Sequence, residues 1–254
     1  MHAIEMQTIS QEFARCWQAA GRHLNGRVQG SIHFWLKANL TPPFLEHLSF
    51  RLGNQLFFIR IADVARRLSV PGSLGGLLMI AEGCNGRACL MPMRLRAGAW
   101  SPATPGWGLV EARTGGLIDP VALVSDARIE MTDWELQDFA VQIVRQQLEA
   151  EGRRLMSWQG NPAVDPSLWY VGDDGPEWVV VRAARYPEKR AVPPANWSAI
   201  ADQCAALGKR GNFASVAVAS ADDSFDPAAP ATPLWRGHEL VVRYHGLEPI
   251  AGLA

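Results

Sequence analysis

The sequence lacks the features that mark several protein classes. No run of 18 consecutive apolar residues occurs among its 254 positions, so no segment is predicted to cross a membrane as a helix. The first residues include Glu5 and Glu12 and do not form the basic and then apolar pattern of a secretory signal peptide. Apolar residues make up 48% of the chain, which excludes an intrinsically disordered protein. We therefore expect a folded cytoplasmic protein that does not associate with membranes.

Cysteine is scarce, and its spacing does not favour a metal site. The chain has four cysteines, of which only Cys84 and Cys89 lie close together in the sequence. Structural zinc sites usually use more closely spaced pairs, and usually two of them. The six histidines show no HExxH spacing, and a disulfide framework is typical of shorter chains with more cysteine. We expect reduced, packed thiols.

Common catalytic motifs are absent as well. The glycine-rich segment 72–76 has neither the spacing nor the lysine of a phosphate-binding loop, and no GxSxG nucleophile elbow occurs. The sequence therefore gives no support to a nucleotide-binding enzyme or to a serine hydrolase.

The charges are unevenly distributed along the chain. Residues 1–113 contain 12 basic and 6 acidic residues, a balance of +6, and residues 114–254 contain 12 and 19, a balance of −7. The sum is the formal net charge of −1. A basic half can bind nucleic acid or an acidic partner. It can equally pack on the acidic half of the same chain, and the sequence leaves these alternatives open.

The first half is predicted to be a helix followed by a mainly β region. The apolar stripe of residues 8–24 predicts the helix, for which Thr8 and Gln11 form a capping box. Residues 48–61 predict a β-hairpin around the Gly53-Asn54 turn. Three short apolar stretches extend the β pattern: 77–81, 88–93 and 107–111. We assign residues 1–126 to this N-terminal domain.

The second half, residues 127–254, predicts alternating helices and strands. A helix begins after Thr132, which forms a capping box with Glu135, and its apolar face continues to Leu148. Three short strands follow, the last of which begins near Glu177. The remaining predicted elements are a helix over 197–207, a strand over 212–220 and a final strand over 240–244. Residues 133–219 therefore read as helix, strand, strand, strand, helix, strand.

This order resembles the αβββαβ core of the restriction-endonuclease-like, or PD-(D/E)xK, superfamily. The resemblance covers about a third of the chain and implies a divalent metal ion, normally Mg²⁺, held by acidic residues of the central hairpin. It also implies a lysine that assists the attacking water. Asp165, which precedes the second predicted strand, matches the first acidic position.

The third predicted strand departs from the superfamily pattern. Val180 occupies the position of the second acid, and Arg182 occupies that of the lysine. Valine cannot bind a metal ion, and arginine is a poor base because its pKa stays above about 12. An active site would need a second acid from elsewhere, namely Glu177 through a β-bulge, or Glu149 or Glu151 at the end of the preceding helix. The candidate catalytic residues are Asp165, Glu177 and Arg182, with Asp165 and Glu177 as candidate metal ligands.

A separate group of residues suggests contact with nucleic acid. Trp100 and Trp107 fall in a segment rich in Gly and Pro that reads as an exposed loop, and they follow Arg94 and Arg96. Exposed aromatic rings among basic residues can stack on bases. Five other tryptophans lie in or beside predicted core elements, where packing explains them: Trp134, Trp158, Trp169, Trp178 and Trp197.

The sequence thus predicts an α+β protein with a mainly β N-terminal region and a nuclease-like core. The favoured interpretation is a non-catalytic binding protein, without a cofactor, whose partner is another protein or a nucleic acid. The first alternative is an active nuclease that uses Mg²⁺ and a relocated second acid. The second alternative is a structural or regulatory protein without a nucleic-acid role, because the acidic second half lacks a basic footprint.

Overall fold

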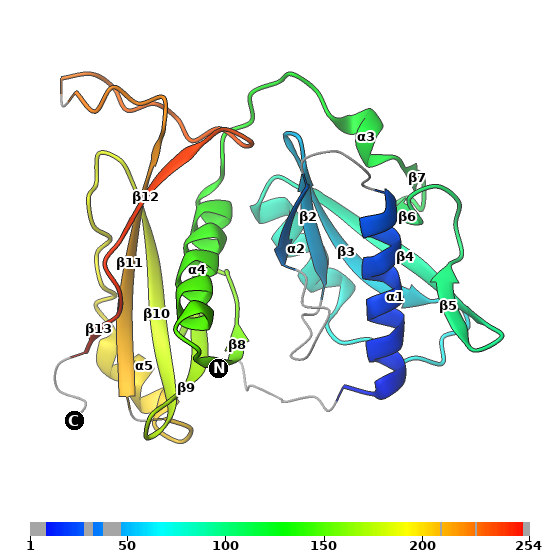
Figure 1. Cartoon of the computed structure of the whole chain (residues 1–254), viewed down its shortest axis with the longest axis horizontal. Helices are drawn as coiled ribbons and strands as arrows, with labels where there is room; N and C mark the ends of the chain where they lie inside the picture. Colours follow the sequence, from blue (N-terminus) through cyan, green and yellow to red (C-terminus); the bar gives the residue numbers. More distant parts are fainter. Residues whose placement is uncertain (1–8, 28–32, 38–46, 209, 227, 251–254) are drawn as a thin grey trace. The chain divides into compact units, whose positions relative to one another are not determined.

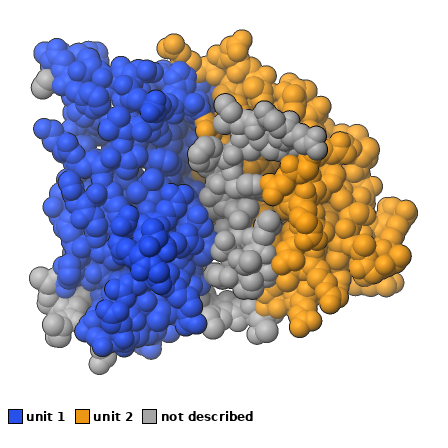
Figure 2. Space-filling model, in the orientation of Figure 1, with its two compact units in different colours: residues 1, 129–254 blue, residues 2–128 orange. Residues whose placement is uncertain are grey.

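The computed structural model describes residues 9–27, 33–37, 47–208, 210–226 and 228–250. It is an α+β structure that divides between Arg128 and Ile129, close to the predicted boundary at 126. Figure 2 colours the two parts, which we call the N-terminal unit (residues 2–128) and the C-terminal unit (residues 129–254). No helix in the described ranges is long and apolar enough to cross a membrane.

The N-terminal unit is built on one mixed sheet in the order β1-β2-β3-β4-β6-β7, with β5 also paired to β4. The predicted hairpin is confirmed, since β2 and β3 are antiparallel and flank Gly53-Asn54. The elements are α1 (Gln11–Arg27), β1 (His33–Lys37), β2 (Leu48–Leu52), β3 (Gln55–Asp63), α2 (Leu74–Gly83), β4 (Arg87–Arg96), β5 (Ala99–Pro102), β6 (Leu109–Glu111), β7 (Leu117–Ile118) and α3 (Pro120–Leu123).

The apolar stretch 77–81 was wrongly predicted to continue the β region, because it lies inside helix α2. This helix starts at Ser73, whose side chain accepts a hydrogen bond from the backbone N–H of Gly76. Strands β3 and β4 are parallel, and a parallel pair needs a long crossover connection that is usually helical. Topology therefore explains the helix, which the local apolar pattern did not reveal.

Helix α1 covers one face of the N-terminal sheet. Its stripe of Phe13, Trp17 and Leu24 is at most 1% exposed and packs in one cluster with side chains of β3 and β4, among them Ile59 and Met91. The predicted helix is thus confirmed. The residue Thr8 of its predicted capping box lies outside the described residues, and within them the Ser10 hydroxyl accepts from the N–H of Phe13.

The C-terminal unit contains the predicted element order over residues 133–220 (Figure 1). Its sheet has the order β12-β11-β10-β9-β8, in which β10 and β11 are parallel and the other neighbours antiparallel, with β13 beside β11. The elements are α4 (Asp133–Ala150), β8 (Arg154–Trp158), β9 (Leu168–Gly172), β10 (Gly175–Arg185), α5 (Trp197–Cys204), β11 (Arg210–Ser220), β12 (Leu240–Tyr244) and β13 (Glu248–Pro249).

Helices cover both faces of this sheet. The Thr132 cap of α4 is confirmed, since its hydroxyl accepts from the N–H of Glu135. On one face, Gln137 of α4 donates to the carbonyl of Val181 in β10. On the other, Trp178 and Val180 pack against α5 in a cluster that includes Ile200 and Cys204. Strand β10 is therefore buried on both sides, which explains its continuous apolar sequence.

The two units share one connectivity. Each begins with a helix, continues with three antiparallel strands and a second helix, and then adds a strand parallel to the third. Each then adds a strand antiparallel to that fourth strand, β5 or β6 in the N-terminal unit and β12 in the C-terminal unit. The αβββαβ order is therefore not peculiar to the C-terminal unit.

The packing of Trp178 predicts a strong effect of one methyl group. A Cβ atom added at Gly211 would lie 2.2 Å from the Trp178 ring, which is fully buried. We expect Gly211→Ala to lower the free energy of unfolding by about 1–3 kcal/mol, as overpacked cores do. Chemical denaturation measures this, with Gly116→Ala as control because its added Cβ would only make a 3.5 Å contact. An unchanged midpoint for Gly211→Ala would contradict the packing described here.

Candidate functional site

Asp165 and Arg182 form a two-pronged ion pair. Arg182 projects from β10, and its Nη1 and Nη2 donate to Oδ1 and Oδ2 of Asp165 at 2.9 and 2.6 Å. The Arg182 side chain is only 22% exposed and the Asp165 side chain only 16%. Nη1 also donates to the carbonyl of Val181. Paired hydrogen bonds between planar charged groups are strong and directional, so they hold Asp165 in one orientation.

This geometry leaves Asp165 poorly placed to bind a cation. Both carboxylate oxygens already accept from the guanidinium group, which carries the positive charge that a metal ion would otherwise supply. In the part of the chain that the structure describes, no group of three or more His, Cys, Asp or Glu residues is arranged to hold a metal ion.

The structure does not bring Glu177 to Asp165. Glu177 lies opposite Tyr170 in the sheet and accepts hydrogen bonds from the Tyr170 hydroxyl and, at 3.1 Å, from Asn212. Burial and the neighbouring Glu177 carboxylate raise the pKa of Tyr170, so its hydroxyl stays protonated as the donor. Glu177 stands five residues before Arg182 on β10, which corresponds to about 16 Å and to the opposite face of the sheet.

The other candidate acids have partners of their own. Glu149 lies 4.0 Å from Arg145, and Glu151 accepts from Gln147. Val180, at the position where the resemblance predicts a second acid, is fully buried against α5. The Val180 side chain is therefore part of the apolar core.

The corresponding arginine of the N-terminal unit has a structural role. A gapless alignment of β3 with β10 sets Leu-Phe-Phe-Ile-Arg beside Trp-Val-Val-Val-Arg, so Arg60 corresponds to Arg182. Arg60 donates to the carbonyls of Val70 and Gly72, each at 3.1 Å, and so ties the segment after β3 to the strand. In both units, the arginine of the third strand donates hydrogen bonds to a neighbouring segment of the chain.

The predicted base-stacking residues differ in exposure. Trp107 is 8% exposed and stacks on Phe50 with ring centroids 6.0 Å apart, so the prediction that it lies in an exposed loop is wrong. Trp100 lies on β5, opposite Leu95 of β4, and its indole N–H donates to Glu12. Arg94 and Arg96 share the end of β4 and form no ion pair with any residue that the structure describes.

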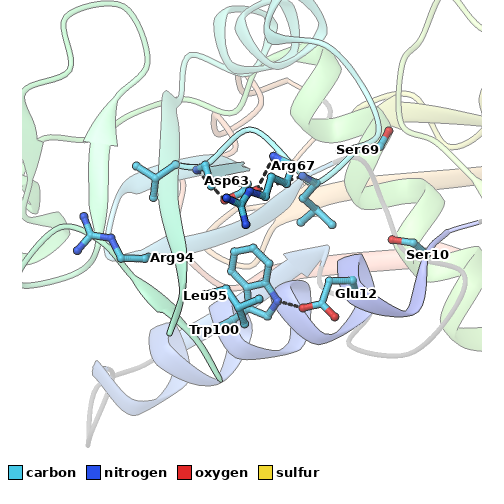
Figure 3. Close-up of a pocket in the computed structure, with 11 residues that line it drawn as sticks. Ser10, Glu12, Asp63, Arg67, Ser69, Arg94, Leu95 and Trp100 are labelled. Carbon is cyan, nitrogen blue, oxygen red and sulfur yellow. Dashed lines mark hydrogen bonds between the residues drawn. The ribbon is translucent and has the colours of Figure 1, made fainter. Parts of the chain in front are cut away.

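Of these residues, Glu12, Arg94, Leu95 and Trp100 border a groove of about 660 Å³ in the N-terminal unit, which we call the α1 groove (Figure 3). Its wall includes the partly exposed Val64 and Leu95, which are 49% and 46% accessible. Figure 3 shows the Trp100 ring meeting Glu12 and the Arg94 side chain extending away from that contact. The groove is lined by Ser10, Glu12, Asp63, Val64, Ala65, Arg67, Leu68, Ser69, Arg94, Leu95 and Trp100.

Asp63 shapes the loop that closes this groove. Its carboxylate accepts from the N–H groups of Ala65, Arg67 and Leu68 at 2.8–3.0 Å. Partial burial acts to raise the pKa of Asp63, but these hydrogen bonds outweigh it and lower the pKa. The carboxylate therefore stays ionised and fixes the loop. The sequence did not reveal Glu12, Asp63 and Arg67 as lining residues because the segments that form the groove, 10–12, 63–69 and 94–100, lie far apart in the chain.

One comparison with known proteins gives a match. Residues 134–250 match the model of a family described as a domain of unknown function, DUF8840. The match begins in α4 and ends after β13, so it covers most of the C-terminal unit. No curated protein and no solved structure matches the chain.

The ion pair yields a stability prediction. We expect Asp165→Ala to lower the free energy of unfolding by about 1.5–3 kcal/mol, because it leaves the guanidinium of Arg182 without the charged partner it bonds. Asp165→Ala combined with Arg182→Met should cost less than the sum of the single changes, as contacting residues do. Urea denaturation of the three variants measures this coupling.

The control is the pair of Arg153 with Asp173, whose side chains are 36% and 79% exposed. Exposed pairs contribute about 0–1 kcal/mol, so Asp173→Ala should change stability little. Equal effects of Asp165→Ala and Asp173→Ala would show that the Asp165 pair has no special structural role.

Proposed function

We propose that this chain is a non-catalytic interaction protein whose C-terminal unit has a nuclease-like arrangement without a working metal site. The observation that carries the proposal is the ion pair of Asp165 with Arg182, in which both oxygens of the candidate metal ligand are occupied. The buried Val180 and the distant Glu177 add support, since neither can complete a metal site beside Asp165.

The α1 groove is the proposed binding site for the partner. Its acidic side chains have local donors, Glu12 from Trp100 and Asp63 from three backbone N–H groups. Arg94, by contrast, is a cation at the groove without an ion-pair partner among the described residues. Apolar side chains such as Val64 and Leu95 also line the groove. This combination suits a protein segment that carries apolar side chains and one acidic side chain that pairs with Arg94.

The same groove is less suited to nucleic acid. Glu12 and the ionised Asp63 both line it and would repel a chain of phosphates. Trp107 is buried, and the indole N–H of Trp100 is engaged by Glu12, which leaves one partly covered ring for stacking. We therefore favour a protein partner over DNA or RNA.

A cleavage assay tests the absence of catalysis. With Mg²⁺ or Mn²⁺ and either plasmid DNA or single-stranded RNA, we expect no cleavage above the level of the Asp165→Ala variant. Metal-dependent cleavage that disappears in Asp165→Ala but persists in Asp173→Ala would overturn the proposal and favour the nuclease alternative.

A binding assay tests the α1 groove. We expect a fluorescent peptide with one Glu among Leu and Phe residues to bind the whole protein, and Arg94→Glu with Trp100→Ala to weaken binding at least tenfold. Fluorescence anisotropy measures the dissociation constants at several salt concentrations, because surface charge effects are screened by salt.

The control variant is Arg22→Glu, which makes the same charge change at an exposed position of α1 away from the groove. Labelled single-stranded and duplex DNA serve as competing probes. DNA could instead bind more tightly than the peptide and lose affinity in the Arg94→Glu, Trp100→Ala variant but not in Arg22→Glu. That result would assign the groove to nucleic acid.

A further inference from the structure

The outer edge of the C-terminal sheet combines an unpaired strand with a groove. Strand β12 is the last in the sheet order, and no strand in the described ranges pairs with its outer side. A cavity of about 350 Å³ lies beside it, which we call the β12 groove. It is lined by Tyr186, Glu188, Lys189, Ala217, Val218, Ala219, Phe225, Val241 and Arg243.

The hydrogen-bond pattern shows which backbone groups of β12 are available. The N–H of Ala221 donates to the carbonyl of Glu239, one step beyond the pair of Ser220 with Leu240. Hydrogen-bonded pairs alternate along an antiparallel ladder, so the next ones inward are Ala219 with Val241 and Ala217 with Arg243. The polar backbone groups of the intervening residues, Leu240, Val242 and Tyr244, therefore point away from β11.

The groove offers an apolar floor on the same side of the sheet as Val241 and Arg243. Ala217 and Ala219 lie beside these two residues in the register and leave room because their side chains are small. Val241 is 46% exposed. An added strand would thus find both backbone partners and a space for one large side chain.

Phe225, which lines the groove, has an unusual backbone conformation. Its φ of +56° is in the left-handed region, which bulky residues seldom adopt, and its ring is 47% exposed. The ring meets Tyr186 edge to face at 5.4 Å between centroids. The largely buried Asp223 fixes the loop by accepting from the N–H groups of Phe225 and Thr232. These interactions thus keep the Phe225 ring partly exposed at the surface.

The charges at the groove favour an acidic occupant. Lys189 and Arg243 line it and form no ion pair within the described part of the chain, against one acidic side chain, Glu188. The neighbouring Arg190 is already paired with Glu248. The lining of the groove therefore carries two basic side chains and one acidic side chain.

We propose that β12 binds an extended peptide segment of another protein as an additional strand, with a bulky apolar side chain in the β12 groove and acidic residues beside Lys189 and Arg243. In this mode of recognition, the backbone hydrogen bonds supply affinity and the groove supplies specificity. The site lies in the C-terminal unit and is separate from the α1 groove of the proposed function.

The test uses the whole protein and synthetic peptides of seven residues. The probe peptide has a central Phe, Val at alternate positions and Glu at both ends, and it carries a fluorescein label. We expect measurable binding by anisotropy, and at least tenfold weaker binding when the end residues are Lys. N-methylation of the peptide backbone at positions that face Val242 should weaken binding to the same extent, and it leaves the protein unchanged.

Two protein variants locate the site. Val242→Pro removes an N–H group that points away from β11, so it should weaken peptide binding at least tenfold while the sheet remains paired. Phe225→Ala should weaken binding by removing the groove wall. Val192→Ala, at a side chain that is 82% exposed and outside the groove, is the control and should bind like the unchanged protein. Circular dichroism confirms that each variant is folded.

Several outcomes would overturn the proposal. One is equal binding of the acidic, basic and N-methylated peptides, and another is full binding by a folded Val242→Pro variant. A dimer in sedimentation that dissociates in Val242→Pro would assign the edge to a second copy of the chain. Because Arg94→Glu with Trp100→Ala leaves β12 unchanged, a loss of peptide binding in that variant would assign the peptide to the α1 groove.

Discussion

The parallel pairing of the third and fourth strands determines the architecture of each unit. A parallel connection cannot be made by a tight turn, so a helix must lie between β3 and β4, and another between β10 and β11. The right-handed sense of such crossovers places this helix on one face of the sheet. The opposite apolar face then needs its own cover, which α1 and α4 provide. One constraint thus yields two helices and a sheet buried on both faces.

The sequence predicts the elements whose signals are local. Thr132 and Glu135 mark the start of α4 by their spacing, and Gly53-Asn54 specifies a two-residue hairpin turn. Helix α2 escapes prediction because its sequence, Leu-Gly-Gly-Leu-Leu-Met-Ile-Ala-Glu-Gly, has almost no polar face, and a short apolar run fits a strand or a buried helix equally well. The sequence also does not reveal the shared connectivity of the two units. Strands β3 and β10 are both apolar and share an arginine, but few of their residues are identical.

The candidate site shows the same division between local and distant information. The order of residues in β10 already indicates that Val180 and Arg182 share one face and that Glu177 lies on the other, because side chains alternate along a strand. Arg182 binds both oxygens of Asp165. This contact depends on how the turn before β9 is positioned beside β10, and no local sequence pattern specifies that position. Trp107 was misassigned because its Gly and Pro neighbours indicate a loop, whereas the stacked ring of Phe50 buries it.

The lengths of helices and strands explain why a groove forms beside β11. Helix α5 has 8 residues and is about 12 Å long, whereas β11 has 11 residues and extends about 36 Å. The helix packs on Trp178 and Val180 near the start of the parallel pair, and its first residue, Trp197, packs against a cluster that includes Ala217 near the end of β11. Ala217 and Ala219 line the groove beyond the helix with small, largely buried side chains, and the Asp223 loop brings Phe225 to the same groove. A longer α5 would fill the space, so the binding surface proposed here follows from a mismatch in length within an otherwise two-sided core.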